Sequence, residues 1–367
     1  MPSDERRTEA RRVLGICNAC GYCNGLCDLF EAAKHRPRLA DGDLAHLANL
    51  CHGCRSCLYA CQYAPPHGFA VNVPRALAEM RHQSYADYAW PRAFAGLLER
   101  GVLTAVMVGL GAVGLLLALV LWSLPHDILF AQHTGPGAFY RIMPWGWMLV
   151  LGLLPLAWSM LAFGMGLHRY WRAARTEAVT LTLRALLSAL RDVLLLRNLS
   201  GGGPGCNDLD EQPSHKRRWI HQGMVLGLLL SFAATGVATY YHHALGWEAP
   251  YPLTSAPVVL GTLGGLLMSA AIAGLLWLKR HGDREPTAAV ALKADYALLV
   301  LLLSVALTGL ALLLWRETAA MGLLLAIHLG SVLAFFLLMP YSKLVHAGYR
   351  FIALLVEASE RTRQRDE

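Results

Sequence analysis

Six long apolar runs constrain the fold of this chain more than any other feature of its sequence. Each is about 20 residues long, enough for a helix to cross a bilayer core of roughly 30 Å. They lie near residues 102–122, 146–168, 219–243, 257–278, 294–315 and 319–340. Of the 367 residues 55% are hydrophobic and only 16% are charged, and the mean hydropathy is +0.40. Because this is too apolar for an ordinary soluble domain, we expect an all-α membrane protein with six transmembrane helices.

The basic residues of the membrane half are concentrated in two of its loops. They are Arg169, Arg172, Arg175, Lys216, Arg217 and Arg218 around the second loop, and Lys279, Arg280, Arg284 and Lys293 around the fourth. The positive-inside rule then places these loops and both termini in the cytoplasm of a bacterial inner-membrane protein. The N-terminal "MPSDERRTEARR" lacks the apolar core of a secretory signal. Despite the net charge of +7, no basic patch interleaved with aromatic residues indicates nucleic-acid binding.

Composition divides the chain into three parts. Residues 1–100 form a polar, cysteine-rich head in which strand-like alternation is nearly absent, so we expect it to be mainly helical. Residues 101–350 form the membrane domain, and 351–367 form a cytoplasmic tail. Within the loop 169–218, the stretch "TEAVTLTLRALLSALRDVLLLRN" carries charges at its centre that argue against a seventh span. It indicates an amphipathic helix on the membrane face, with packing against the head as the alternative.

Eight cysteines of the head repeat one spacing, C-x2-C-x2-C-x3-C, first in "CNACGYCNGLC" and then in "CHGCRSCLYAC". This is the bacterial ferredoxin spacing, in which three close thiolates bind one [4Fe–4S] cluster and the fourth binds the other cluster. The first cysteine set is then Cys17, Cys20, Cys23 and Cys61, and the second is Cys51, Cys54, Cys57 and Cys27. The spacing therefore predicts two [4Fe–4S] clusters with crossed ligation.

Zinc is the alternative metal for such a head. Structural zinc sites usually use two separated C-x2-C pairs rather than a run of four cysteines, which favours iron–sulfur clusters. The motifs depart from the ferredoxin pattern in one respect, because Asp28 and Gln62 stand where proline usually follows the last cysteine. Cys206 has no companion at metal-binding spacing, so we expect it to be structural.

Histidines at two depths of the third and sixth apolar runs indicate haem. Clusters need an electron acceptor, and b-type haem is held by axial imidazoles. His328 and His346 are 18 residues apart, which returns to the same helix face after about five turns. On the third run, His221 lies at one end and His242 and His243 lie at the other. Because the two runs are antiparallel, we expect His221 to meet His346, and His242 or His243 to approach His328, which gives one or two haem sites.

These histidines differ in how strongly they indicate a ligand. At a helix end a histidine is commonly an interfacial polar group. His328 lies deep in a span, where an ionisable residue indicates a functional site. Spacing alone does not separate His242 from His243, and His168 at the end of the second run is the reserve ligand.

Several segments in order resemble one known family. The double ferredoxin motif is followed by "LSGGGPGC", "RRWIHQG", "FAATGVATYYHHALGWEAPY" and "SAPVVLGTLGG". Nearly end to end, the chain is similar to the tricarballylate or citrate utilisation protein B family. The resemblance implies a membrane Fe–S and haem protein that reoxidises the flavin of a partner FAD-dependent tricarballylate dehydrogenase and passes electrons to quinone. No G-x-G-x-x-G loop opens a βαβ unit here, so the flavin is expected in that partner.

The leading hypothesis is an electron-transfer subunit without catalytic residues for a substrate of its own. The alternative from another class is a membrane transporter with an Fe–S or zinc redox-sensing head, which predicts more intramembrane charge than Asp295 alone. A third hypothesis keeps the clusters, omits haem and reduces quinone from the clusters directly. Tyr341 and Lys343 are candidates for shaping a quinone site, with structural roles as the alternative.

Overall fold

The computed structural model describes residues 3–175, 179, 181–200 and 203–366, which are mostly helical. In this part of the chain there is no β-strand, only an isolated bridge between Cys206 and Ser214. Among the described residues, six helices are long and apolar enough to cross a membrane, the last with its following turn η3 (Met339–Tyr341). They are α7 (Val102–Ser123), α10 (Trp145–Ala174), α12 (Lys216–Leu245), α13 (Ala256–His281), α14 (Ala289–Trp315) and α15 (Met321–Leu338). The predicted all-α, six-span fold class is confirmed.

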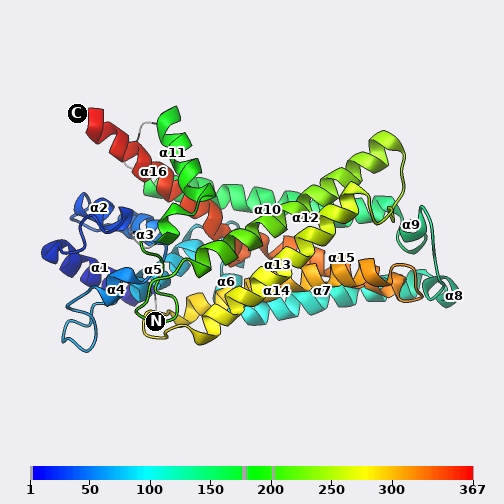
Figure 1. Ribbon diagram of the computed structural model, residues 1–367, viewed down its shortest axis with the longest axis horizontal. Helices are drawn as coiled ribbons and strands as arrows, with labels where there is room; N and C mark the ends of the chain where they lie inside the picture. The colour runs from blue at the N-terminus through cyan, green and yellow to red at the C-terminus, as the bar shows by residue number, and fades with distance from the viewer. Residues whose placement is uncertain (1–2, 176–178, 180, 201–202, 367) are drawn as a thin grey trace.

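The long helices run along the long axis of the molecule, and the head lies at one end of them (Figure 1). We call this end of the bundle the head end, and the opposite end the far end. The head contains α1 (Ser3–Cys20), α2 (Asp28–Lys34), α3 (Asp41–Leu50), α4 (Ser56–Tyr59) and α5 (Val73–Tyr88). The short α6 (Gly96–Arg100) leads from the head into α7, and α8 (His126–Leu129) and α9 (Ala138–Ile142) lie at the far end.

Helix α15 lies at the centre of the bundle. Of the 18 most apolar consecutive residues of α15 and its following turn 61% are buried, against 11% for α10 and for α12, so few residues of these two helices are fully covered by the rest of the chain. Glycines allow the closest contacts between helices. A Cβ on Gly330 of α15 would lie 2.7 Å from the Cα of Val113 in α7, and one on Gly227 of α12 would lie 2.8 Å from the carbonyl oxygen of Gly264 in α13. Small residues are usual at such contacts because close van der Waals packing, rather than the hydrophobic effect, drives helix association in lipid.

The head shares its hydrophobic core with the C-terminal helix α16 (His346–Asp366). Leu14, Leu44 and Leu77 of the head are fully buried. Ala353 and Leu354 of α16 belong to the same core. The boundary predicted at residue 350 therefore lies inside α16, which connects the head end of the bundle to the core of the head.

Helix α11 (Leu183–Leu194) forms within the stretch predicted to be amphipathic. Its small residues Ala185 and Ala189 are buried in the core of the head, where α11 packs against α16. Leu183, Leu187 and Leu194 are exposed on the other side. The alternative prediction, packing against the head, thus describes the alanine face of α11. The exposed leucines form the opposite, apolar face of this amphipathic helix.

Candidate functional site

The first cysteine set lies near the surface of the head. Burial, together with the neighbouring thiols of Cys23, Cys61 and Cys20, raises the pKa of Cys17 to about 12. Burial and the thiols of Cys61 and Cys20 also raise the pKa of Cys23. Cys61, from the second motif, therefore stands among the cysteines of the first motif. Cys20 and the intervening Tyr22, which is 72% exposed, place this set within reach of another protein.

The second cysteine set lines a cavity of the head that Asn198 of η2 (Arg197–Ser200) also borders. Cys27, Cys51, Cys54 and Cys57 all border this cavity. Burial, followed by the neighbouring Cys51 and Cys54, raises the pKa of Cys27 to about 12. The backbone N–H of Gly53 donates to the sulfur of Cys51 over 3.4 Å, from a left-handed conformation with φ of +62° that glycine adopts without strain. Cys27, from the first motif, thus completes the set of the second motif.

The donor chemistry of both sets fits iron–sulfur clusters. Burial raises the pKa of Cys17, Cys23 and Cys27, so their thiolates are costly without a cation, and a bound metal provides that compensation. Among the described residues, no three cysteine, histidine or carboxylate side chains converge closely enough for a single metal ion. A zinc ion draws four sulfurs to about 2.3 Å from one centre, whereas each thiolate of a four-iron cluster binds a different corner. The unbroken run of four cysteines in each motif, in place of two separated pairs, favours the cluster over zinc.

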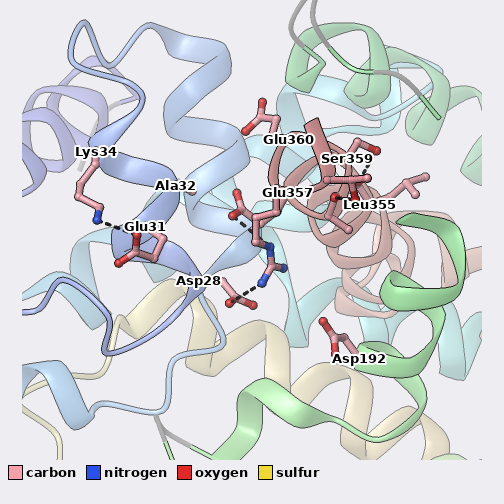
Figure 2. A network of polar contacts seen from close by, with 12 residues as sticks. Asp28, Glu31, Ala32, Lys34, Asp192, Leu355, Glu357, Ser359 and Glu360 are labelled. Carbon is pink, nitrogen blue, oxygen red and sulfur yellow. Dashed lines mark hydrogen bonds and ion pairs between the residues drawn. The ribbon is translucent and has the colours of Figure 1, made fainter. Parts of the chain in front are cut away.

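Asp28, which stands where ferredoxins place proline, connects the first motif to the C-terminal helix. Its carboxylate accepts hydrogen bonds from Arg361 of α16 and from Arg197 of η2 (Arg197–Ser200), both at 3.2 Å. Arg361 also pairs with Glu357 at 3.5 Å. Figure 2 shows Asp28 facing α16 across this network. The departure from the ferredoxin pattern thus anchors the residue next to Cys27.

Two arginines of the bundle hold the loop of the second motif. Arg217 of α12 donates to the carbonyls of His52 at 3.0 Å and Gly53 at 2.8 Å. Arg350 of α16 donates to the carbonyl of Cys51 at 2.8 Å. The positive-inside argument explained Arg217 by topology alone and missed Arg350. The available signal was spacing, because each arginine is four residues from a candidate haem histidine.

Those histidines, His221 and His346, face each other at the head end of the bundle. Their ring centroids are 6.2 Å apart and their planes are 86° apart. A metal bound at about 2.0–2.1 Å by two imidazole nitrogens separates the ring centres by about 6 Å. Nδ1 of His346 lies 2.6 Å from the carbonyl of Lys343, and because a carbonyl only accepts, Nδ1 carries the proton and Nε2 is free for metal. Nδ1 of His221 is buried with no partner among the described residues. The pair fits the axial ligation of haem.

At the far end the structure differs from the expected approach of His242 or His243 to His328. His242 stacks on Trp145 with ring centroids 4.8 Å apart, and its Nδ1 lies 3.2 Å from the hydroxyl of Tyr140. His243 meets the edge of Trp145. His242 lies on the face of α12 that lines the cavity beside His328, one helical turn beyond the last lining residue, Ala238. There Trp145 and Tyr140 cover its ring.

His328 itself is half-buried inside the bundle, with Nδ1 3.1 Å from the hydroxyl of Thr308. It borders a cavity of about 480 Å³ between α12, α13, α14 and α15. In the described part of the lining there is no other histidine. Of the two predicted histidine pairs, the structure thus brings together His221 and His346, whereas His328 faces the cavity instead of a second histidine.

The remaining candidates from the sequence do not lie where they could bind haem or quinone. His168 is exposed on α10. Lys343 and Lys279 both form ion pairs with Asp295 at the head end. Tyr341 and Lys343 border a cavity of only about 20 Å³, room for about one water molecule, so the structure shows no quinone pocket there.

Replacing Arg350 with glutamine is expected to lower the midpoint potential of an iron–sulfur cluster bound by the second cysteine set. An oxidised cluster with four thiolates is anionic and becomes more so on reduction, so a nearby positive charge favours the reduced state. The described residues include no carboxylate paired with Arg350, so its charge is not cancelled locally. The measurement is a redox titration followed by electron paramagnetic resonance. Arg284→Gln, at an exposed arginine, is the matched control, and equal potentials in the two variants would refute this role.

Comparison with known proteins finds two family models that match successive parts of the chain. The family model described as citrate utilization protein B matches residues 99–367, and the model described as citrate utilization protein B Fer4-like domain matches residues 10–87. The curated citrate utilization protein B of Escherichia coli is 43% identical over 373 aligned positions, which cover 98% of this chain and 94% of that protein. No solved structure matches the chain significantly.

Proposed function

The chain belongs to the citrate utilization protein B family, and from this premise we propose that it is the membrane electron-transfer subunit of a flavoprotein dehydrogenase. The family and the Fer4-like domain indicate a role in citrate utilisation with iron–sulfur chemistry. In the proposal, electrons pass from an FAD-dependent dehydrogenase resembling tricarballylate dehydrogenase, through two [4Fe–4S] clusters and b-type haem, to the membrane quinone. The organic acid is oxidised in that partner, at the cytoplasmic face of the inner membrane.

The observation that carries the proposal is the direct connection between the second cysteine set and the histidine pair. Arg217 holds the carbonyls of residues 52 and 53 from one helical turn before His221. Arg350 holds the carbonyl of Cys51 from one turn after His346. Two rigid helices therefore fix the position of the cluster loop relative to the candidate haem ligands. Clusters and haem supply one-electron chemistry that side chains lack, and the chain supplies their spacing and their protection from water.

The order of the two cysteine sets supports the direction of transfer. The first set includes the exposed Cys20, whereas Cys51 and Cys57 of the second set are at most 9% exposed. A partner flavoprotein would therefore meet the first set, and the second set lies between it and the bundle. By contrast, no observation favours the transporter alternative, because the carboxylate of Asp295 is paired with two lysines.

The test is reoxidation of the reduced protein by quinone. The purified protein is reduced with dithionite, freed of excess reductant and mixed without oxygen with a water-soluble quinone analogue. We expect the iron–sulfur absorption to return and the reduced haem bands to disappear with stoichiometric formation of quinol. A reduced protein that remains unchanged with quinone would contradict quinone as the acceptor.

A further inference from the structure

The cavity beside His328 is large and unused by the site at the head end. Its volume of about 480 Å³ lies within the range of roughly 300–1,000 Å³ usual for ligand and cofactor sites. Aliphatic and aromatic side chains form most of its wall, and the small residues Ala234, Gly261 and Gly265 also border it. It is therefore shaped for a bulky, mainly apolar group.

His328 presents a free imidazole nitrogen at this cavity. The hydroxyl of Thr308 donates to the carbonyl of Ser304 at 2.7 Å, so its oxygen accepts from Nδ1–H of His328 at 3.1 Å. Nε2 is then unprotonated, which is the form in which imidazole binds a metal. Gly309 gives the ring its space, because a Cβ there would lie 3.0 Å from Cε1 of His328.

Arg316 lies toward the far end of the same cavity. It follows Gly309 by seven residues, so it lies on the same face of α14, about 10 Å further along the helix. The residue is 9% exposed, and one N–H donates to the carbonyl of Tyr251 at 2.7 Å. Its paired carboxylate, Glu317, is 3.7 Å away and exposed. A buried guanidinium with unused donors favours an anionic group in the cavity.

We propose that this cavity is a haem site in which His328 is the sole axial imidazole and Arg316 binds the haem carboxylates. The inference rests on the proposed function, because it extends the haem content of the same chain. Haem is planar and apolar except for two carboxylates at one edge. This matches the imidazole of His328 on α15, which lies beside Gly309, and the guanidinium of Arg316 about 10 Å beyond Gly309 along α14. Quinones carry no carboxylate for Arg316 to bind.

The site differs from the His221–His346 pair in having no second imidazole. His242, the next histidine on the cavity-lining face of α12, is engaged by Trp145 and Tyr140 instead. A haem held by His328 alone would keep one iron position without a protein ligand, and carbon monoxide would bind there after reduction. Haem held by two imidazoles offers no such position.

The experiment is a haem count and a carbon monoxide difference spectrum of the reduced, purified full-length protein. We expect two haems per chain in the unchanged protein, one of them responsive to carbon monoxide. His328→Ala should halve the haem content and abolish the response, and His346→Ala should keep the response. His126→Ala, at an exposed histidine of the far end, is the control. A full haem content, or a persisting response, in His328→Ala overturns the inference.

A second variant tests the carboxylate contact while leaving the imidazole in place. Arg316→Gln should lose the responsive haem to a haem-accepting protein about 10–100-fold faster, with Arg316→Lys in between. Arg141→Gln, at an exposed arginine of the same end, is the matched control. Equal loss rates in Arg316→Gln and the control overturn the role of Arg316. A protein without any haem would refute the proposed function, whereas a single unresponsive haem would leave that function standing and refute this inference.

Discussion

Replacing His346 with alanine is expected to remove the haem at the head end of the bundle and to slow quinone-linked reoxidation of the clusters by more than about 100-fold, beyond the range usual for outer-shell residues. The ring of His221 would keep one bond to iron, but the ring 6.2 Å away that completes the pair would be gone. The measurement combines the haem count with stopped-flow reoxidation by a quinone analogue. Both cysteine sets should retain their iron, because His346 is not among their ligands.

His168→Ala is the matched control for this prediction. His168 lies at the head end of α10 but is exposed, and no ring contact joins it to His221. The control should keep its haem bands and its reoxidation rate. A haem spectrum in His346→Ala equal to that of the control would show that the pair does not hold haem.

Serine substitutions at two cysteines of the same motif are expected to remove different clusters. Cys57 lies with Cys51, Cys54 and Cys27, whereas Cys61 lies with the first set. Each single substitution should therefore lower bound iron by about four atoms, and the double substitution at Cys57 and Cys61 should remove nearly all of it. Iron analysis and electron paramagnetic resonance measure both effects.

A second double substitution tests whether Cys61 binds the cluster of the first motif. Cys17→Ser combined with Cys61→Ser should lose no more iron than Cys61→Ser alone, because both residues serve one cluster. Cys206→Ser is the control, since the buried Cys206 thiol donates to the carbonyl of Leu199. If substitutions at Cys57 and Cys61 together remove only one cluster, each motif binds its own cluster and the crossed arrangement is wrong.

Periodicity and spacing predict those features that depend on local sequence. The six spans follow from runs of apolar residues. The ferredoxin rule predicts that Cys61 lies with the cysteines of the first motif and Cys27 with those of the second. His221 and His346 meet at the head end as predicted, but the predicted continuous helix from His328 to His346 is wrong. Helix α15 ends at Leu338 before the turn that contains Pro340, and His346 begins α16. In each case one element, or two elements of known direction, contains the whole signal.

Features that depend on loops and on packing between distant segments could not be predicted in this way. His242 is engaged by Tyr140 and Trp145, which reach it from α9 and the start of α10. Arg350 donates to the carbonyl of Cys51, which lies 299 residues earlier in the chain. The cavity at Arg316 and His328 exists only where four helices pack. No periodicity within one segment encodes these contacts.

The measurement that tests the central claim most directly is the visible absorption spectrum of the purified protein, oxidised and then reduced with dithionite, with iron and haem quantified on the same sample. The account predicts sharp reduced b-type bands over a broad bleaching, and iron that exceeds about eight atoms per chain by the haem count. Bleaching without sharp bands, in a sample without haem, would contradict it and leave His221 and His346 without their proposed role.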